Sequence, residues 1–551
     1  MTARGWAVSL AALGTACLIA GCTDPRPPAP VAAATPPAPV SAAVREQLLD
    51  GAFAVLERLD EFEESAAFAQ VFDRLNQWGH GAAPLAAEWR RDPLCDTLPG
   101  SLAPLAAADR LGSAVFDAAT DVVALRDQRW LASIAAQARG SAVDDLAIAT
   151  NLFQWTVRSL AVVGDPPAVP TAQTPGSRWM RPGEILLSGR ASPAQRAWIF
   201  LELLRQVGLD GVMLATGGAD TAQRPQRPWV PALIAAGEAY LFEPAYGMPI
   251  PGPGGRGIAT ARQAAADASI LAGMSTDDRP YPVQAGDIQG LGVMVAGDPW
   301  TLSRRMTLVD RGLSAAHGMR VALDASAVAD RARAALPAGP TAVVSLWPFP
   351  WETVQRQQSM AGPVRAAIGR ELAPLGVALQ QPAPDARGTP RVVRPLFVAR
   401  VKEFRGDLDG PDGAKAAYLA ARPSRQAMAA ALRGVPPAQA DAVRRVYEQM
   451  KEDATYWLGI LTLAEGEFDT AVDYLERMTL AATPDGRWTD AARTNLAQAF
   501  IALGRSSEAA ALLRADPSPQ RFGSRLLARR IEAAASDAGP DAPPQASPSQ
   551  R

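Results

Sequence analysis

The sequence predicts an α+β protein that is mostly helical, and three stretches of the chain support this prediction. Residues 43–163 and 411–535 repeat apolar side chains at spacings of three and four, the period of amphipathic helices. Between them, residues 189–255 read as a helix, a strand and a hairpin, so we expect a helix packed on an antiparallel sheet there. The chain has 551 residues, of which 48% are hydrophobic, enough for roughly three or four domains.

The first 21 residues are expected to be a signal peptide. Arg4 supplies a basic start, and Ala7–Ala20 is an apolar stretch too short to span a bilayer comfortably. The sequence LIAGC at residues 18–22 resembles the lipobox of bacterial lipoproteins. This resemblance implies that Cys22 is lipidated and becomes the first residue of the mature chain.

A lipidated Cys22 would anchor the protein to a membrane, with its folded part in the cell envelope outside the cytoplasm. The alternatives are an ordinary signal peptide with an incidental cysteine, or an uncleaved anchor. Residues 22–42 are rich in Pro and Ala and are expected to form an extended linker. Residues 536–551 have the composition of a disordered tail.

Composition also argues against several classes of partner. The formal net charge of -2 gives no reason to expect nucleic acid. With Cys17 removed and Cys22 lipidated, Cys95 has no partner for an intrachain disulfide. His80 and His317 lack metal-ligand spacing, and no phosphate-binding loop is present, so we expect no metal and no cofactor.

Residues 43–143 are expected to be a helical region, and a second domain is expected at 144–270. The domain opens with a helix over Asp144–Val163, whose acidic start suits the positive end of a helix. A second helix starts at residues 192–193, where a serine N-cap is followed by a proline at the first helical position.

Two hairpin strands are expected next, over Trp229–Ile234 and Tyr240–Pro244. The helix ends in LLRQVGL at residues 203–209, and the hairpin carries Trp-Val and then an aromatic strand ending in Glu-Pro. This order resembles the transglutaminase-like branch of the papain-like fold. The resemblance implies a helix packed on an antiparallel sheet and a thiol-dependent acyl-transfer site.

That site requires a Cys at the helix start, a His on the first hairpin strand and an Asp at the end of the second. Aligned on the LLRQVGL segment, these positions fall on Pro193, Arg227 and Glu243. Proline is inert, and Arg has no accessible base form. The resemblance therefore implies a degenerate triad, no catalytic residues and a pseudo-enzyme.

Several alternatives remain open from the sequence. Ser192 could replace the nucleophile, although N-capping already accounts for it. Arg227 and Glu243 could form a permanently charged pair in place of His and Asp, or both could be solvated. Cys95 and His80 could form a dyad outside the resembling core.

Residues 271–410 are expected to mix helices and strands in a fold that the sequence does not identify. A helix is predicted just before this region at 258–275 and another within it at 300–316. Residues 319–325 and 341–349 read as strands, and 391–406 as a strand or a helix start.

Residues 411–535 contain two segments that align with each other at a separation of 38 residues. The aligned pairs are Leu458/Leu496, Gly459/Ala497, Gly466/Gly504 and Ala471/Ala509. This pattern resembles a tetratricopeptide repeat, with small residues where paired helices touch and Gly at the turn. Such repeats imply a groove for a protein or peptide partner, or else a helical cap.

The function predicted first is a membrane-anchored, catalytically inactive transglutaminase-like lipoprotein that binds or organises protein in the envelope. A second hypothesis is an envelope peptidase or transglutaminase with an unrecognised thiol site. A third is a repeat scaffold in which the resemblance of the middle segment is accidental.

Overall fold

The computed structural model describes residues 41–59, 61–80, 88–164, 179–217, 226–313, 317–337, 342–359, 362–381 and 391–538. The predicted signal peptide, Cys22 and nearly all of the predicted linker and tail lie outside these residues. Within the described residues the protein is α+β and mostly helical, which confirms the predicted fold class.

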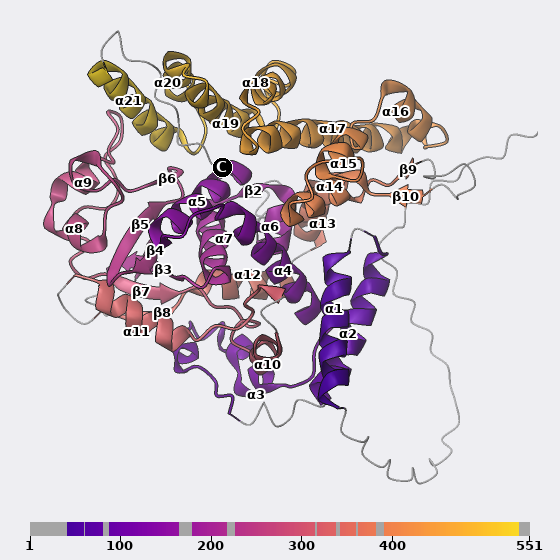
Figure 1. Ribbon diagram of the computed structural model, residues 1–551, viewed down its shortest axis with the longest axis horizontal. Coiled ribbons are helices and arrows are strands. Elements are labelled where there is room, and N and C mark those ends of the chain that lie inside the picture. Colours follow the sequence, from indigo (N-terminus) through magenta and orange to yellow (C-terminus); the bar gives the residue numbers. More distant parts are fainter. Residues whose placement is uncertain are drawn as a thin grey trace, which may run out of the picture.

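Helices make up the N-terminal part of the described chain. They are α1 (Ala42–Glu57), α2 (Glu64–His80), η2 (Pro93–Thr97), η3 (Ala103–Ala106), α3 (Ala108–Gly112), α4 (Asp121–Ala138) and α5 (Asp145–Ser159). The hairpin of α1 and α2 stands at one side of the molecule (Figure 1). Helix α5 starts as predicted, because the Asp144 carboxylate accepts the Ala147 N–H at 2.8 Å. It ends before Val163 because strand β1 (Ala161–Val162) pairs with β2 (Arg190–Ala191).

A six-stranded sheet lies at the centre of the described chain, in the order β6-β5-β4-β3-β7-β8. Its strands are β3 (Asp210–Thr216), β4 (Arg227–Ala235), β5 (Glu238–Glu243), β6 (Met248–Pro249), β7 (Gly292–Val295) and β8 (Val344–Leu346). Strands β4 and β5 form the predicted hairpin, with Ala232 opposite Leu241. Strands β7 and β8 pair in parallel and come from the region 271–410, so the sheet crosses the domain boundary predicted at residue 270.

Helix α7 (Pro193–Gln206) packs on β3 and β4 and follows α6 (Pro182–Ser188). Ser192 and Gln195 form a capping box in which each side chain accepts the other residue's backbone N–H, at 3.3 and 3.0 Å. Helices α4 and α5 also contact α7. The helix is therefore enclosed on most of its circumference, and its side chains from Gln195 to Leu204 are all buried.

Short elements fill the rest of the middle region. They are η4 (Pro253–Gly255), α8 (Ala261–Ala266), α9 (Ala268–Ala272), α10 (Arg304–Gly312), α11 (Ala325–Ala335), α12 (Pro348–Ser359), α13 (Gly362–Leu372), η6 (Ala373–Gly376), β9 (Leu379–Gln381), β10 (Arg391–Val393) and α14 (Pro395–Arg405). The stretch 391–406 thus contains the strand β10 followed by the helix α14.

Two predictions for the middle region are wrong. Residues 319–325 form no strand; they run irregularly into α11, and the Asp310 carboxylate accepts the Val321 N–H at 2.7 Å. The single helix predicted at 258–275 is two short helices. Asp267 ends α8 and its carboxylate caps α9, because a short acidic side chain competes well for the free N–H groups of a helix start.

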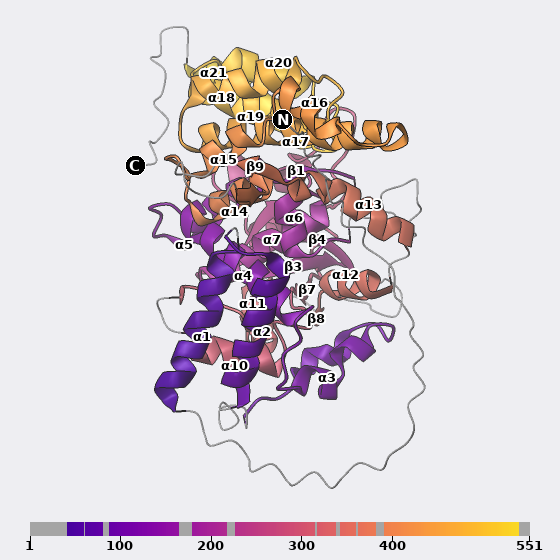
Figure 2. The same cartoon turned by 90° about the vertical axis from the view of Figure 1, so that its right-hand side faces the viewer.

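The C-terminal helices form a layer over one end of the sheet and its covering helices, with α17 and α19 toward the core and α18 and α20 away from it (Figures 1 and 2). They are α15 (Ala414–Ala420), α16 (Arg425–Leu432), α17 (Pro437–Ala464), α18 (Phe468–Val472), the π-helical turn η7 (Asp473–Leu480), α19 (Thr489–Ala502), α20 (Ser506–Arg514) and α21 (Arg521–Ala538).

The predicted repeat residues have the expected local roles. Gly466 and Gly504 follow α17 and α19 with φ of +80° and +75°, where glycine is favoured. A Cβ on Gly459 would lie 2.9 Å from Leu475 Cδ2, so a small residue lets the paired helices approach. No helix among the described residues is both long and apolar enough to span a membrane.

Candidate functional site

The start of α7 is where the resemblance places a nucleophile, and Pro193 occupies it. The adjacent Ser192 is fully buried, and its hydroxyl caps the helix by accepting the Gln195 N–H. Gly189, three residues earlier, faces the repeats: a Cβ there would lie 2.1 Å from Cζ2 of Trp457. The C-terminal layer therefore covers the end of α7 at which a nucleophile would be exposed.

Arg196, in the second turn of α7, joins this end of the core to the repeats. Its guanidinium donates to the carbonyls of Val157, Leu160 and Pro244 at 3.3, 2.8 and 3.0 Å and to Gln520 Oε1 at 2.7 Å. Burial lowers the pKa of Arg196 to about 9, and no carboxylate is among its hydrogen-bond partners in the described residues. Two of the carbonyls end α5, whose negative helix end favours a cation.

The two other predicted triad positions do not meet. Arg227 is exposed at the start of β4, and among the described residues the Glu243 carboxylate has Tyr281 and Ala245 as its partners and forms no ion pair with Arg227. Glu243 is buried at the end of β5, where its carboxylate accepts the Tyr281 hydroxyl at 2.5 Å and the Ala245 N–H at 3.0 Å. The indole of Trp229 donates to the same Tyr281 oxygen at 2.9 Å.

The surroundings of Glu243 perturb its ionisation. Burial raises the pKa of Glu243 to about 7, although the hydrogen bonds from Tyr281 and Ala245 oppose the shift. Tyr246 packs edge-on against Tyr281 and also contacts Phe522 of the repeat layer, with ring centroids 5.6 and 6.0 Å apart. Tyr281 and Tyr246 thus connect the buried carboxyl to the contact between the core and the repeats.

Aromatic rings and arginine fill the side of α17 that faces the core. Tyr456 stacks on Trp488 with centroids 4.2 Å apart, and Trp457 meets Trp488 edge-on at 5.3 Å. Arg400 of α14 lies over the Trp457 ring at 3.6 Å, and the Trp488 indole donates to Asp453 at 2.7 Å. Around Trp457 the repeats therefore contact the chain's own core.

The Cys95–His80 alternative gains no support from the geometry of Cys95. The thiol is 2% exposed within η2, and burial raises its pKa to about 11. A nucleophilic thiol needs the opposite shift, because the thiolate is the reactive form.

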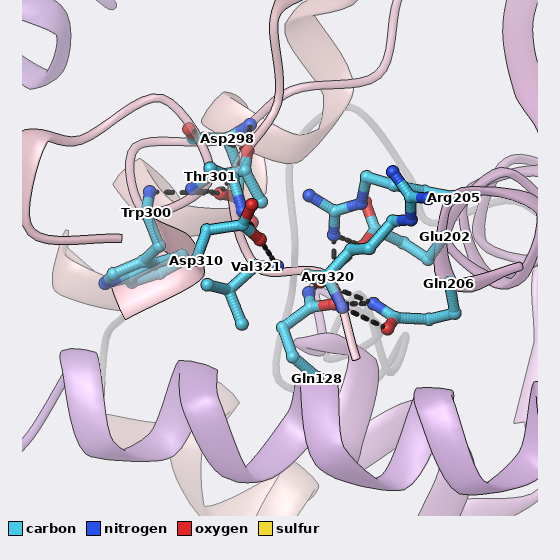
Figure 3. Close-up of polar contacts among 11 residues, drawn as sticks. Gln128, Glu202, Arg205, Gln206, Asp298, Trp300, Thr301, Asp310, Arg320 and Val321 are labelled. Atoms are coloured by element: carbon cyan, nitrogen blue, oxygen red, sulfur yellow. Dashed lines mark hydrogen bonds and ion pairs between the residues drawn. The ribbon is translucent and has the colours of Figure 1, made fainter. Parts of the chain in front are cut away.

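A separate polar cluster joins α4 and α7 to residues 298–321 (Figure 3). Gln128 donates to Glu202 at 3.0 Å and accepts from Arg205 and Gln206 at 3.0 and 2.7 Å. Burial raises the pKa of Glu202 and of nearby Asp298. The adjoining cavity of about 10 Å³ has room for roughly one water, so this cluster has a structural role.

Two larger cavities open to solvent. One, of about 520 Å³, lies among α2, α4, α6, η6 and α14. Its arginines are engaged: Arg126 pairs with Asp127 at 2.7 Å, and Arg394 reaches Glu64 at 3.5 Å. The other, of about 220 Å³, lies between α5 and α17, where the core meets the repeats.

Sequence reasoning missed Arg196 and Tyr281 as partners of the predicted site. A visible signal existed for Arg196, because an arginine directly before the apolar residues 197–201 of α7 requires polar partners if it is buried. No such signal marks Tyr281, which lies 38 residues from Glu243 in the chain.

The tetratricopeptide repeat family model matches residues 462–529, which run from the end of α17 into α21. This match bears out the repeat predicted at the C-terminus. No curated protein and no solved structure shows a significant match to the chain.

Proposed function

We propose that the protein is a membrane-anchored bacterial lipoprotein that binds another protein in the cell envelope. Its transglutaminase-like core would be catalytically inactive and would act as the support on which the repeats are held. The observation that carries the proposal is the tetratricopeptide repeat at 462–529, packed over the start of α7. Repeats of this kind form concave protein-binding surfaces.

The residues at the three resembling positions support the absence of catalytic function. Pro193 cannot be ionised, exposed Arg227 cannot accept a proton at neutral pH, and Glu243 is held by Tyr281. These three positions together lack a nucleophile, a base and an orienting group for one.

The test of protein binding uses the full chain, because removal of the repeats would uncover the buried aromatic surface around Trp457. Proteins captured from detergent-solubilised membranes would be purified, titrated against the full chain, and mapped by hydrogen exchange. We expect a partner that protects amides in α17–α21. A partner that protects only α1–α4 would show that the repeats are not the docking surface.

The membrane anchor is tested by substitution of Cys22→Ser. The variant is expected to move from the membrane fraction to the soluble fraction, because it lacks the thiol that receives the lipid. Cys17→Ser is the matched control, since Cys17 would be removed with the signal peptide and its loss should leave the protein in the membrane. Retention of the Cys22→Ser protein in the membrane would exclude a lipid anchor at this residue.

The alternative of a thiol-dependent enzyme is tested at Cys95. We expect no amide hydrolysis, no amine incorporation and slow labelling by a thiol-directed probe, because the thiol is buried and its pKa is raised to about 11. Activity that disappears in Cys95→Ala, with an unchanged melting temperature, would establish an enzyme instead.

A further inference from the structure

The cavity of about 220 Å³ between α5 and α17, which we call the junction cleft, is built jointly by the core and the repeats. Helix α5 contributes Trp155, Arg158 and Ser159, and α17 contributes Ile460 and Leu461. Figures 1 and 2 show these helices on adjacent layers of the molecule. The cleft therefore exists only while the repeats are docked on the core.

The acidic residues that line the junction cleft already have cationic partners. Glu403 binds Arg400 at 2.6 Å and accepts the Tyr418 hydroxyl. Glu465 binds Lys415 at 2.8 Å. Neither carboxylate is therefore left without a counter-ion, and both would repel a ligand that carries a large negative charge.

Arg158 differs from these residues, because its guanidinium forms no hydrogen bond and no ion pair among the described residues. Its Nε is buried without a partner, and so is the hydroxyl of Ser159, a residue that is 1% exposed. Burial lowers the pKa of Arg158, although nearby Glu403 and Tyr456 oppose the shift. An unpaired buried donor and an unpaired cation both cost folding free energy. Their presence at this site indicates that a bound ligand supplies the missing partners.

We propose that the junction cleft binds a carboxylate on a peptide segment of the protein partner, with Arg158 as its counter-ion and Ser159 as a hydrogen-bond donor. This inference rests on the proposed protein-binding function. A single unpaired cation flanked by Glu403 and Glu465 suits one negative charge better than two. The volume of about 220 Å³ is smaller than a typical small-molecule pocket of roughly 300–1,000 Å³, so it fits one or two residues. Trp155 and Ile460 supply an apolar wall for the neighbouring peptide atoms.

The probe is a library of fluorescent heptapeptides in matched sets. One set carries Glu or Asp against Gln or Asn at an internal position, and the other carries a free against an amidated C-terminus. The full wild-type chain is expected to bind a carboxylate member at least tenfold more tightly than its amide counterpart. The set that shows the preference identifies the source as a side chain or a chain end.

Arg158→Gln is expected to abolish the preference for carboxylate while weak peptide binding persists. The matched control is Arg425→Gln, because Arg425 is exposed on α16 and should not affect the preference. Equal binding of acid and amide members by wild type, or an unchanged preference in Arg158→Gln, would overturn this inference while leaving protein binding intact. No peptide binding by wild type, together with no partner captured from membranes, would overturn both.

Thermal stability gives a second readout. Arg158→Gln is expected to keep or raise the melting temperature, because it removes a half-buried charge that has no partner in the free protein. A fall of several degrees would show that Arg158 is a structural residue and would contradict a role in ligand binding.

Discussion

Gly189→Ala is expected to destabilise the protein by about 3 kcal/mol, from a left-handed backbone and a steric clash acting together. Gly189 ends α6 with φ of +64°, a conformation that costs alanine about 1 kcal/mol. Its new Cβ would lie 2.1 Å from Cζ2 of Trp457. That indole is held between Arg400 and Trp488, so it cannot move aside without loosening the repeat layer.

Gly254→Ala is the matched control for this prediction. Gly254 has the same φ of +64°, but no heavy atom beyond the glycine itself and its two chain neighbours lies within 4 Å of the position of its added Cβ. It should therefore report the backbone cost alone, about 1 kcal/mol. Urea unfolding measures both variants, and hydrogen exchange in α17–α19 shows whether the repeats detach first. Equal losses in the two variants would show that the contact of Gly189 with Trp457 is not tight.

Local signals in the sequence predicted the elements whose structure is set locally. Ser192 followed by Pro193 marked the start of α7, and the capping box at that place explains the success. The glycines at 466 and 504 marked the ends of α17 and α19, because a positive φ at a helix end favours glycine wherever it occurs. These features depend on neighbouring residues and are visible in one stretch of sequence.

The failures involve contacts between distant parts of the chain. The strand predicted at 341–349 contains β8 (344–346), but its parallel pairing with β7 was not predicted, because the pattern of one strand does not identify its partner. Residues 319–325 alternate side chains like a strand. They form an irregular segment instead, in which the Val321 N–H donates to the carboxylate of Asp310. The period of the side chains indicates which face of an element is apolar. It does not indicate which polar group will form the hydrogen bonds of its backbone N–H and C=O groups.

The candidate site shows the same division. The resemblance predicted that Glu243 keeps a carboxyl at this position. The hydrogen bond from Tyr281 and the burial that raises the pKa of Glu243 depend on the folded structure and could not be read from the hairpin sequence. The repeats were predicted as a separate module. Their docking was not, because the link from Arg196 to Gln520 spans 324 residues of sequence.

The second large effect is expected at Glu243, whose ionisation should make stability depend on pH. Burial raises the pKa of Glu243 from 4.5 to about 7 in the folded protein. Between these values the folded state binds more protons than the unfolded state, so stability is fully present below pH 4.5 and is lost as the pH rises through 7. A shift of this size corresponds to about 3 kcal/mol.

Glu243→Gln should remove this dependence, because the amide has the shape of the protonated acid and does not titrate. The free energy of unfolding of wild type minus that of the variant is expected to fall by about 2.5 kcal/mol between pH 5 and pH 8. Glu508→Gln is the control: Arg505 lowers the pKa of this exposed carboxyl, so its titration lies below that window. A constant difference for Glu243→Gln across the range would mean that the carboxyl stays ionised and that the Tyr281 hydrogen bond outweighs burial. If the difference falls, hydrogen exchange at the start of α21 should rise with it, because Tyr246 connects Tyr281 to Phe522.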